Sequence, residues 1–187
     1  MFMMLGTGLQ HRRIGIVGMG DIGLAVARRA RAFGMHVAYH NRRAVDPTTE
    51  AQLGATLLPL SELLSTSDVV SLHCPYTPET HHLINRDSLG LMRPTSYLIN
   101  TARGPIVDEA ALVEALTNGV IAGAGLDVYE NEPTVHPGLL HLDNVALAPH
   151  LGSATEETRT EMALLAARNV IEVMAGNPPI TPVRPRS

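Results

Sequence analysis

Short apolar runs alternate with alanine-rich or amphipathic stretches along the chain. Residues 14–17 form a continuous apolar run, which predicts a strand. Residues 24–33 follow a cluster of glycines, are rich in Ala and Arg, and predict a helix that Gly34 ends. The next apolar run, residues 36–40, predicts a second strand. The first forty residues are therefore expected to form a β-α-β unit.

The same alternation continues to the end of the chain. Four further apolar bursts predict strands within residues 67–75, 95–104, 120–130 and 143–150, and three helix patterns cover residues 60–65, 107–119 and 155–174. Asp108 is expected to cap the second of these helices and Gly119 to end it. The bursts are continuous rather than alternating, which is typical of strands that are buried on both faces. We expect an α/β fold with a doubly wound, Rossmann-type parallel sheet of about six or seven strands and helices on both faces.

Composition favours one globular domain. The chain has 187 residues, of which 45% are hydrophobic, so it can bury a sizeable core. We expect the dinucleotide-binding domain to span residues 13–176, and the proline-rich residues 177–187 to form a linker or a frayed tail.

Charge and targeting signals are weak. A net charge of -4 offers no general surface for nucleic acid or for an anionic membrane. The apolar residues 1–10 lack the basic start of a signal peptide, and no run is long enough to predict a membrane-spanning helix. Cys74 is the single cysteine, which excludes an internal disulfide. We expect a cytoplasmic protein with no nucleic-acid or membrane partner.

Candidate chemistry begins at the glycine cluster. Gly18, Gly20 and Gly23 form a G-x-G-x-x-G pattern around Asp21 and Ile22, and this pattern fits either a dinucleotide cradle or a tight turn. In a doubly wound sheet, ligands bind beyond the carboxyl ends of the strands. Polar residues follow the other predicted strands at that edge, within residues 40–43, 101–104, 127–132 and 149–150.

Five ordered motifs carry a resemblance to a known family. The sequence resembles the D-isomer-specific 2-hydroxyacid dehydrogenases, especially the glyoxylate/hydroxypyruvate reductase branch. The motifs are GIVGMGDIG (15–23), DVVSLHCPYTPETHHLI (68–84), LINTARGPIVDEAAL (98–112), GAGLDVYENEP (123–133) and LAPHLGSAT (147–155). The resemblance spans most of the chain, and it implies reduction of a small 2-keto acid to the D-2-hydroxy acid.

The resemblance implies three catalytic residues. Arg103 matches the family arginine that orients the substrate, while Glu132 and His150 match the family's Glu-His pair. Arginine suits a carboxylate because it can form charge-assisted hydrogen bonds. His150 would give a proton to the carbonyl oxygen as hydride arrives from the nicotinamide, and Glu132 would favour the protonated ring. Taken singly, each residue would more often be a surface or packing residue, and the matching motifs reverse that balance.

The cofactor is expected to be NADP(H) rather than NAD(H). Asn41 stands where NAD-specific sites carry an acidic residue, and the adjacent Arg42 and Arg43 can neutralise a 2′-phosphate. The alternative is that these three residues form an exposed basic turn without selectivity. The resemblance further implies that the nicotinamide end is lined by Cys74, Pro75, Thr101, Ala102, Asp127 and Ser153.

Four other side chains complete the inventory. His73 is expected either to line the nicotinamide pocket or to close a strand, and His81 and His82 are expected in a surface loop. Cys74 is expected to be a small buried residue and not a nucleophile. No spacing typical of metal ligands occurs, so no metal site is predicted.

The resemblance also implies a second domain. Family members have a substrate domain beside the nucleotide domain, whereas residues 1–12 resemble only the end of the linker and entry turn that precede the first strand. Two functions are therefore open: an oxidoreductase whose sequence is shortened here, or a non-catalytic NADP(H)-binding module. The family resemblance implies a homodimer.

Overall fold

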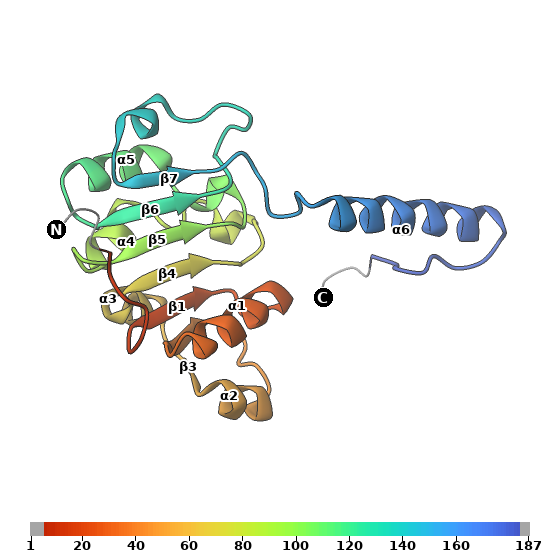
Figure 1. Ribbon diagram of the computed structural model, residues 1–187, viewed down its shortest axis with the longest axis horizontal. Coiled ribbons are helices and arrows are strands. Elements are labelled where there is room, and N and C mark those ends of the chain that lie inside the picture. The colour runs from red at the N-terminus through yellow and green to blue at the C-terminus, as the bar shows by residue number, and fades with distance from the viewer. Residues whose placement is uncertain (1–5, 184–187) are drawn as a thin grey trace. The chain divides into compact units, whose positions relative to one another are not determined.

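The computed structural model describes residues 6–183 (Figure 1). Residues 1–5 of the predicted entry segment and residues 184–187 of the predicted tail lie outside this range. The chain forms two compact units, Met1–Pro149 and His150–Ser187, and each is considered by itself. The domain limits expected from the sequence, residues 13–176, remain a prediction.

The first unit is built on a seven-stranded parallel sheet, which confirms the expected fold class. The strand order is β3-β2-β1-β4-β5-β6-β7, so the chain runs outward from β1 in one direction and then from β4 in the other (Figure 1). The strands are β1 Arg13–Val17, β2 His36–His40, β3 Ala55–Leu57, β4 Val69–Leu72, β5 Tyr97–Asn100, β6 Gly123–Leu126 and β7 Val145–Leu147. The order reverses between β1 and β4, where such sheets bind ligands.

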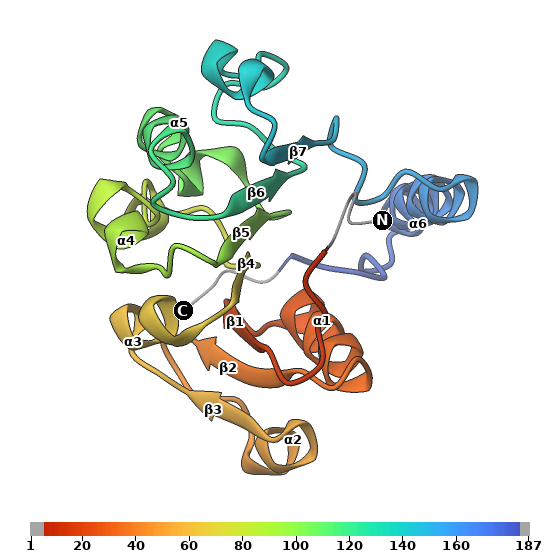
Figure 2. The same cartoon turned by 60° about the vertical axis from the view of Figure 1, so that its left-hand side comes forward.

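Helices cover both faces of this sheet, as expected. The helices α3, α4 and α5 lie on one face, and α1 packs beside α2 on the other (Figure 2). Their bounds are α1 Asp21–Ala32, α2 Pro47–Leu53, α3 Leu60–Thr66, α4 Arg86–Leu91 and α5 Glu109–Thr117, with 3-10 turns η1 Pro78–Thr80, η2 Gly104–Ile106 and η3 Pro137–His141. The Asp108 side chain accepts a hydrogen bond from Ala111 N at 3.0 Å, and Gly119 follows α5 with a φ of 67°, so both predicted helix signals are confirmed.

Helix α1 begins three residues earlier than the sequence pattern predicts. The sequence pattern assigns Gly23 to the glycine turn that precedes the helix, and glycine is a poor helix former. Gly23 is nevertheless buried within α1, and a Cβ atom there would overlap the carbonyl oxygen of Gly18. Close packing of helix against turn therefore outweighs helix propensity at this position.

Two apolar cores lie on the two faces of the sheet. The larger one joins α3, α4 and α5 to the strands through fully buried residues such as Leu63, Leu89 and Leu112. The smaller one joins α1 and α2 to β1 and β2, and it includes Ile16 and Tyr39, both with no exposed surface. Burial on both faces explains why the strands read as continuous apolar runs.

The second unit contains helix α6, Glu156–Met174, which Thr155 caps by accepting a hydrogen bond from Thr158 N. No residue of α6 is buried, and its apolar side chains include Met174, which is 84% exposed. The predicted tail partly returns to the helix, because Asn169 Nδ2 donates to Thr181 Oγ1 at 2.9 Å. None of the helices within residues 6–183 combines the length and apolar content needed to cross a membrane.

Candidate active site

The glycine turn between β1 and α1 separates into two kinds of position. Gly18 has a φ of 96°, and a Cβ atom there would lie 2.6 Å from Cys74 Cα, so it packs against the segment that follows β4. Gly23 packs against Gly18 in the same way. A Cβ atom on Gly20 would meet nothing within 4 Å. Chain packing therefore explains Gly18 and Gly23, whereas Gly20 borders open space.

The start of α1 beside Gly20 has the features that favour an anion. Gly20 is the N-cap of α1. No capping side chain accepts a hydrogen bond from the first N–H groups of this helix. The first N–H groups of any helix lack partners within the helix, and its dipole favours an anion there. Asp21 and Ile22 begin α1, and the Ile22 side chain is 68% exposed. The turn thus has the shape and polarity of a dinucleotide cradle.

Asn41 connects the second strand to this cradle. Its side-chain Oδ1 accepts a hydrogen bond from Met19 N at 2.6 Å. Only the oxygen of a side-chain amide can accept a hydrogen bond from a backbone N–H. The NH₂ group of Asn41 is therefore the part that can donate to another partner. Arg42 and Arg43 follow directly and are exposed. Donors are therefore gathered where an NAD-specific site would carry a carboxylate.

The segment after β4 forms the next part of the edge. His73 Nε2 lies 2.9 Å from Ser71 Oγ, and burial lowers the pKa of His73, which favours the neutral ring. Burial raises the pKa of Cys74, which favours the thiol over the nucleophilic thiolate. Pro75 is exposed at the surface beside them. The pKa direction supports the interpretation of Cys74 as a packing residue.

Asn100 shapes the turn that carries Thr101, Ala102 and Arg103. It is the last residue of β5 and is 1% exposed. Its Oδ1 accepts from Ala102 N at 3.0 Å, and its Nδ2 donates to Arg103 O at 3.0 Å. The guanidinium of Arg103 is exposed, and its Nη1 donates to Ala102 O at 2.6 Å. Sequence analysis did not select Asn100, although a buried asparagine at a strand end is a signal for a shaped turn.

The Arg103 turn lies directly against the segment after β6. Gly104 is buried, and a Cβ atom on it would overlap the backbone between Tyr129 and Glu130. In that segment, the Glu132 side chain accepts a hydrogen bond from Tyr129 N at 3.1 Å. Asp127, the residue after β6, is also buried. The structure therefore brings Arg103 and the loop of Glu132 together at one edge, as the sequence predicts.

A carboxylate pair and a histidine brace this loop. Glu109 Oε1 accepts from Glu130 N at 2.7 Å, and Glu130 Oε2 accepts from Glu109 N at 3.4 Å. Glu130 Oε1 also lies 2.8 Å from His82 Nε2. His81 is exposed as expected, and His82 lies in the same turn with its side chain 32% exposed and paired with Glu130. The motifs contained Glu109 and Glu130, but pattern alone gave them no role.

Glu109 is expected to make stability depend on pH. Burial raises its pKa above 4.5, and the charge of Glu130 adds to this, while hydrogen bonds from Glu130 and His136 oppose it. The folded state then holds this proton more tightly than the unfolded state, so its contribution is present below pH 4.5 and is lost as pH rises through the folded pKa. We expect Glu109→Gln to be increasingly more stable than the parent protein as pH increases.

Urea unfolding of both proteins at a series of pH values measures this difference. Titrating groups that do not interact with Glu109 affect both proteins alike, so the difference between their free energies of unfolding reports Glu109 together with its neighbours Glu130 and His136. Parallel curves across the pH range would contradict the prediction.

His150 and Ser153 belong to the second unit. His150 is its first residue, is exposed, and has a φ of 56°, a left-handed conformation that is uncommon for histidine. Ser153 is half-buried before α6. Their catalytic and cofactor-binding roles remain predictions.

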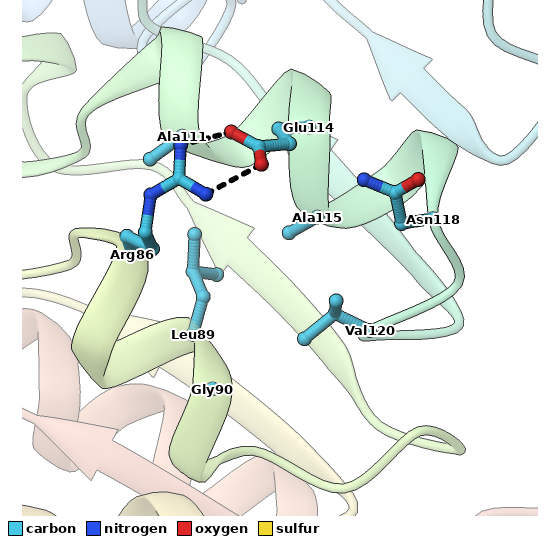
Figure 3. Close-up of a pocket in the computed structure, with 8 residues that line it drawn as sticks. All are labelled: Arg86, Leu89, Gly90, Ala111, Glu114, Ala115, Asn118 and Val120. Atoms are coloured by element: carbon cyan, nitrogen blue, oxygen red, sulfur yellow. Dashed lines mark hydrogen bonds and ion pairs between the residues drawn. The ribbon is translucent and has the colours of Figure 1, made fainter.

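A pocket of about 180 Å³ lies away from all these residues, between α4 and α5 (Figure 3). On one side of the pocket, the Arg86 guanidinium and the Glu114 carboxylate form an ion pair with two hydrogen bonds. The other lining side chains are mainly short or apolar, so it is a groove of helix packing that contains no predicted site residue. Within residues 6–183, no cluster of His, Cys, Asp and Glu is arranged to hold a metal ion.

Comparison with known proteins gives a consistent match. Residues 2–152 match the sequence profile of the family described as D-isomer specific 2-hydroxyacid dehydrogenase, NAD binding domain. The chain is 55% identical over 179 residues to a glyoxylate reductase of Thermococcus onnurineus, and the match covers 96% of this chain and 53% of that protein. The chain spans about half the length of the curated relatives it matches.

Solved structures agree with this match. A glyoxylate reductase from Paecilomyes thermophila superposes with a TM-score of 0.88 at 46% identity, over 95% of this chain and 53% of that one. An NADPH-dependent glyoxylate/hydroxypyruvate reductase from Sinorhizobium meliloti, in complex with NADP and malonate, gives a TM-score of 0.88 at 43% identity, over 96% of this chain and 56% of that one.

Proposed function

Because the chain belongs to the family of D-isomer specific 2-hydroxyacid dehydrogenase NAD-binding domains, we propose that it is the nucleotide-binding part of a reductase that converts glyoxylate or a similar 2-keto acid to the 2-hydroxy acid. The observation that carries this proposal is the packing of Gly104 against the backbone between Tyr129 and Glu130. This packing holds Arg103 beside the loop of Glu132, at the same sheet edge as the glycine turn.

Each catalytic residue has a separate proposed task. Arg103 is an exposed cation that binds the substrate carboxylate through charge-assisted hydrogen bonds. His150 donates a proton to the carbonyl oxygen as it becomes a hydroxyl, and Glu132 favours the protonated imidazole. NADP(H), when bound, supplies the hydride.

The remaining predicted residues hold the cofactor in this proposal. The phosphates lie at Gly18, Gly20 and Gly23, where the turn has no side chain to exclude them, and Asp21 and Ile22 follow in the first turn of α1. The nicotinamide end is lined by the residues after β4, β5 and β6, which are Cys74, Pro75, Thr101, Ala102 and Asp127. The cofactor-binding role of Ser153 rests on the family resemblance alone.

We propose NADP(H) as the preferred cofactor. The Asn41 oxygen is already used by Met19 N, so its NH₂ group can donate to a 2′-phosphate, and Arg42 and Arg43 supply positive charge. An acidic residue at this place would repel that phosphate. The NADPH dependence stated for the Sinorhizobium meliloti relative supports the same choice.

The test of this function uses the 187-residue protein with no other component. Binding of NADPH and NADH is measured by calorimetry, and turnover is measured as loss of NADPH absorbance with glyoxylate or hydroxypyruvate. We expect NADPH to bind more tightly than NADH, and we expect NADPH to be consumed only when the keto acid is present. Binding without turnover would favour a non-catalytic module, and tighter binding of NADH would overturn the cofactor preference.

We also propose a cytoplasmic homodimer. The single cysteine is consistent with a reducing compartment, and exposed apolar side chains such as Phe33 and Leu140 supply the kind of surface that an interface needs. Light scattering of the purified protein should give twice the mass of the chain, and a monomer mass at micromolar concentration would contradict the dimer.

A further inference from the structure

Tyr39 links the second strand to the basic turn from inside the protein. It lies near the carboxyl end of β2, has no exposed surface, and packs in the apolar core beside Leu53 of α2. Its hydroxyl accepts a hydrogen bond from Val45 N at 3.1 Å and donates one to Glu50 Oε1 at 2.5 Å. Burial, together with the bond to Glu50, raises the pKa of Tyr39, so the hydroxyl stays protonated and able to donate.

The turn of residues 41–45 is therefore tied at both ends. Its first residue, Asn41, accepts a hydrogen bond from Met19 N at 2.6 Å. Its last residue, Val45, donates its backbone N–H to the Tyr39 hydroxyl. Arg42 and Arg43 lie between these two attachments and are exposed. A turn that is fixed before binding loses less conformational entropy when its side chains engage a ligand.

The start of α2 reinforces the second attachment. Asp46 caps this helix by accepting from Thr49 N at 2.9 Å. Glu50 lies one residue further in the same helix, so its bond to Tyr39 fixes the helix, and the turn that enters it, to the sheet. The second half of the connection from β2 to α2 is thus held by Tyr39, Asp46 and Glu50, none of which has a proposed contact with the ligand.

Electrostatics indicate where Arg42 lies. The pKa of Glu79 is lowered first by a hydrogen bond from Thr77, then by its own backbone, and to a smaller extent by the charge of Arg42. Glu79 belongs to η1, which follows β4, the strand next to β1. The charge of Arg42 therefore acts on the segment that follows β4.

We propose that Tyr39, through its hydrogen bonds to Val45 and Glu50, is a positioning residue that sets the preference for a dinucleotide carrying a 2′-phosphate. The inference rests on the proposed NADP(H) preference and deepens it. Arg42 and Arg43 supply the charge, and Tyr39 holds the backbone that presents them. Without the hydroxyl, the turn keeps its two arginines but loses one of its two attachments.

The substitution Tyr39→Phe tests this role because it removes only the hydroxyl and preserves the buried ring. We expect the NADPH dissociation constant to rise about 3- to 10-fold, in line with the loss of one buried hydrogen bond, while that of NADH changes by less than about 2-fold. The matched control is Tyr97→Phe. Tyr97 is the first residue of β5, so it lies at the amino ends of the strands, opposite the proposed site, and it is 41% exposed. Both constants should therefore stay at the parent values.

A second measurement isolates the adenosine end. The dissociation constants of adenosine 2′,5′-bisphosphate and of AMP are measured for both proteins. Tyr39→Phe should raise the constant of the bisphosphate and leave that of AMP unchanged. A merely structural role would weaken both ligands by the same factor, and that result, or no change in either, would overturn the inference. If the parent protein shows no preference for NADPH, the cofactor preference fails and this inference fails with it. A preference that is unchanged in Tyr39→Phe overturns the inference alone.

Discussion

Replacing Gly104 with alanine is expected to destabilise the protein by roughly 3 kcal/mol, which corresponds to a fall in Tm of about 6–12 °C for a chain of this size. The added Cβ would overlap the backbone between Tyr129 and Glu130, which cannot move as a flexible side chain can. The same backbone carries the bond from Glu130 N to Glu109 and leads to Glu132. Relief of the overlap must therefore separate the Arg103 turn from the Glu132 loop.

Thermal unfolding followed by circular dichroism measures this effect, and Gly90→Ala is its matched control. Gly90 lies inside α4, and a Cβ atom there would meet nothing within 4 Å. Alanine is favoured over glycine within a helix, so the control is expected to gain about 0.5–1 kcal/mol. Equal Tm values for the two variants would show that Gly104 does not hold the two segments together.

Strand β2 is found at residues 36–40, as expected, because its buried residues form a continuous apolar run. Helix α6 lies within the predicted residues 155–174 because its 19 residues contain neither Gly nor Pro. The short strand β3 was not predicted, because two of its three residues are exposed at the edge of the sheet and produce no apolar run. Helix α4 was missed for a related reason: it has only six residues, and Asn85 rather than an apolar pattern defines its start.

The candidate site also contains residues that the sequence predicts and residues that it does not. Motif residues such as Arg103 and the three glycines could be selected because their types carry chemistry at recognisable spacings. Tyr39 and Asn100 could not be selected, because a tyrosine or an asparagine at a strand end is common. Their importance depends on the hydrogen bonds that the hydroxyl and the amide make in the folded protein. Glu109 and Glu130 are separated by 21 residues, so their reciprocal hydrogen bonds are set by the fold and not by local sequence.

Replacing Gly20 with valine should weaken NADPH binding by about 100-fold or more while leaving the protein folded. The side chain would enter the open space at the start of α1, where the cofactor phosphates are proposed to lie, and would block their approach to the helix N–H groups. Nothing within 4 Å opposes the new Cβ, so the stability cost is limited to the poorer N-cap, about 1 kcal/mol or less.

The matched control for this change is Gly8→Val. Gly8 is exposed, and a Cβ atom there would also meet nothing within 4 Å, so valine adds the same bulk at a position that has no proposed contact with a ligand. Thermal unfolding should therefore show that both variants stay folded. Calorimetry should show that only Gly20→Val loses NADPH binding. If Gly20→Val binds NADPH as the parent does, the glycine turn is a packing device and the cofactor must lie elsewhere. Loss of binding together with loss of fold would show that Gly20 serves the turn itself, as Gly18 and Gly23 do.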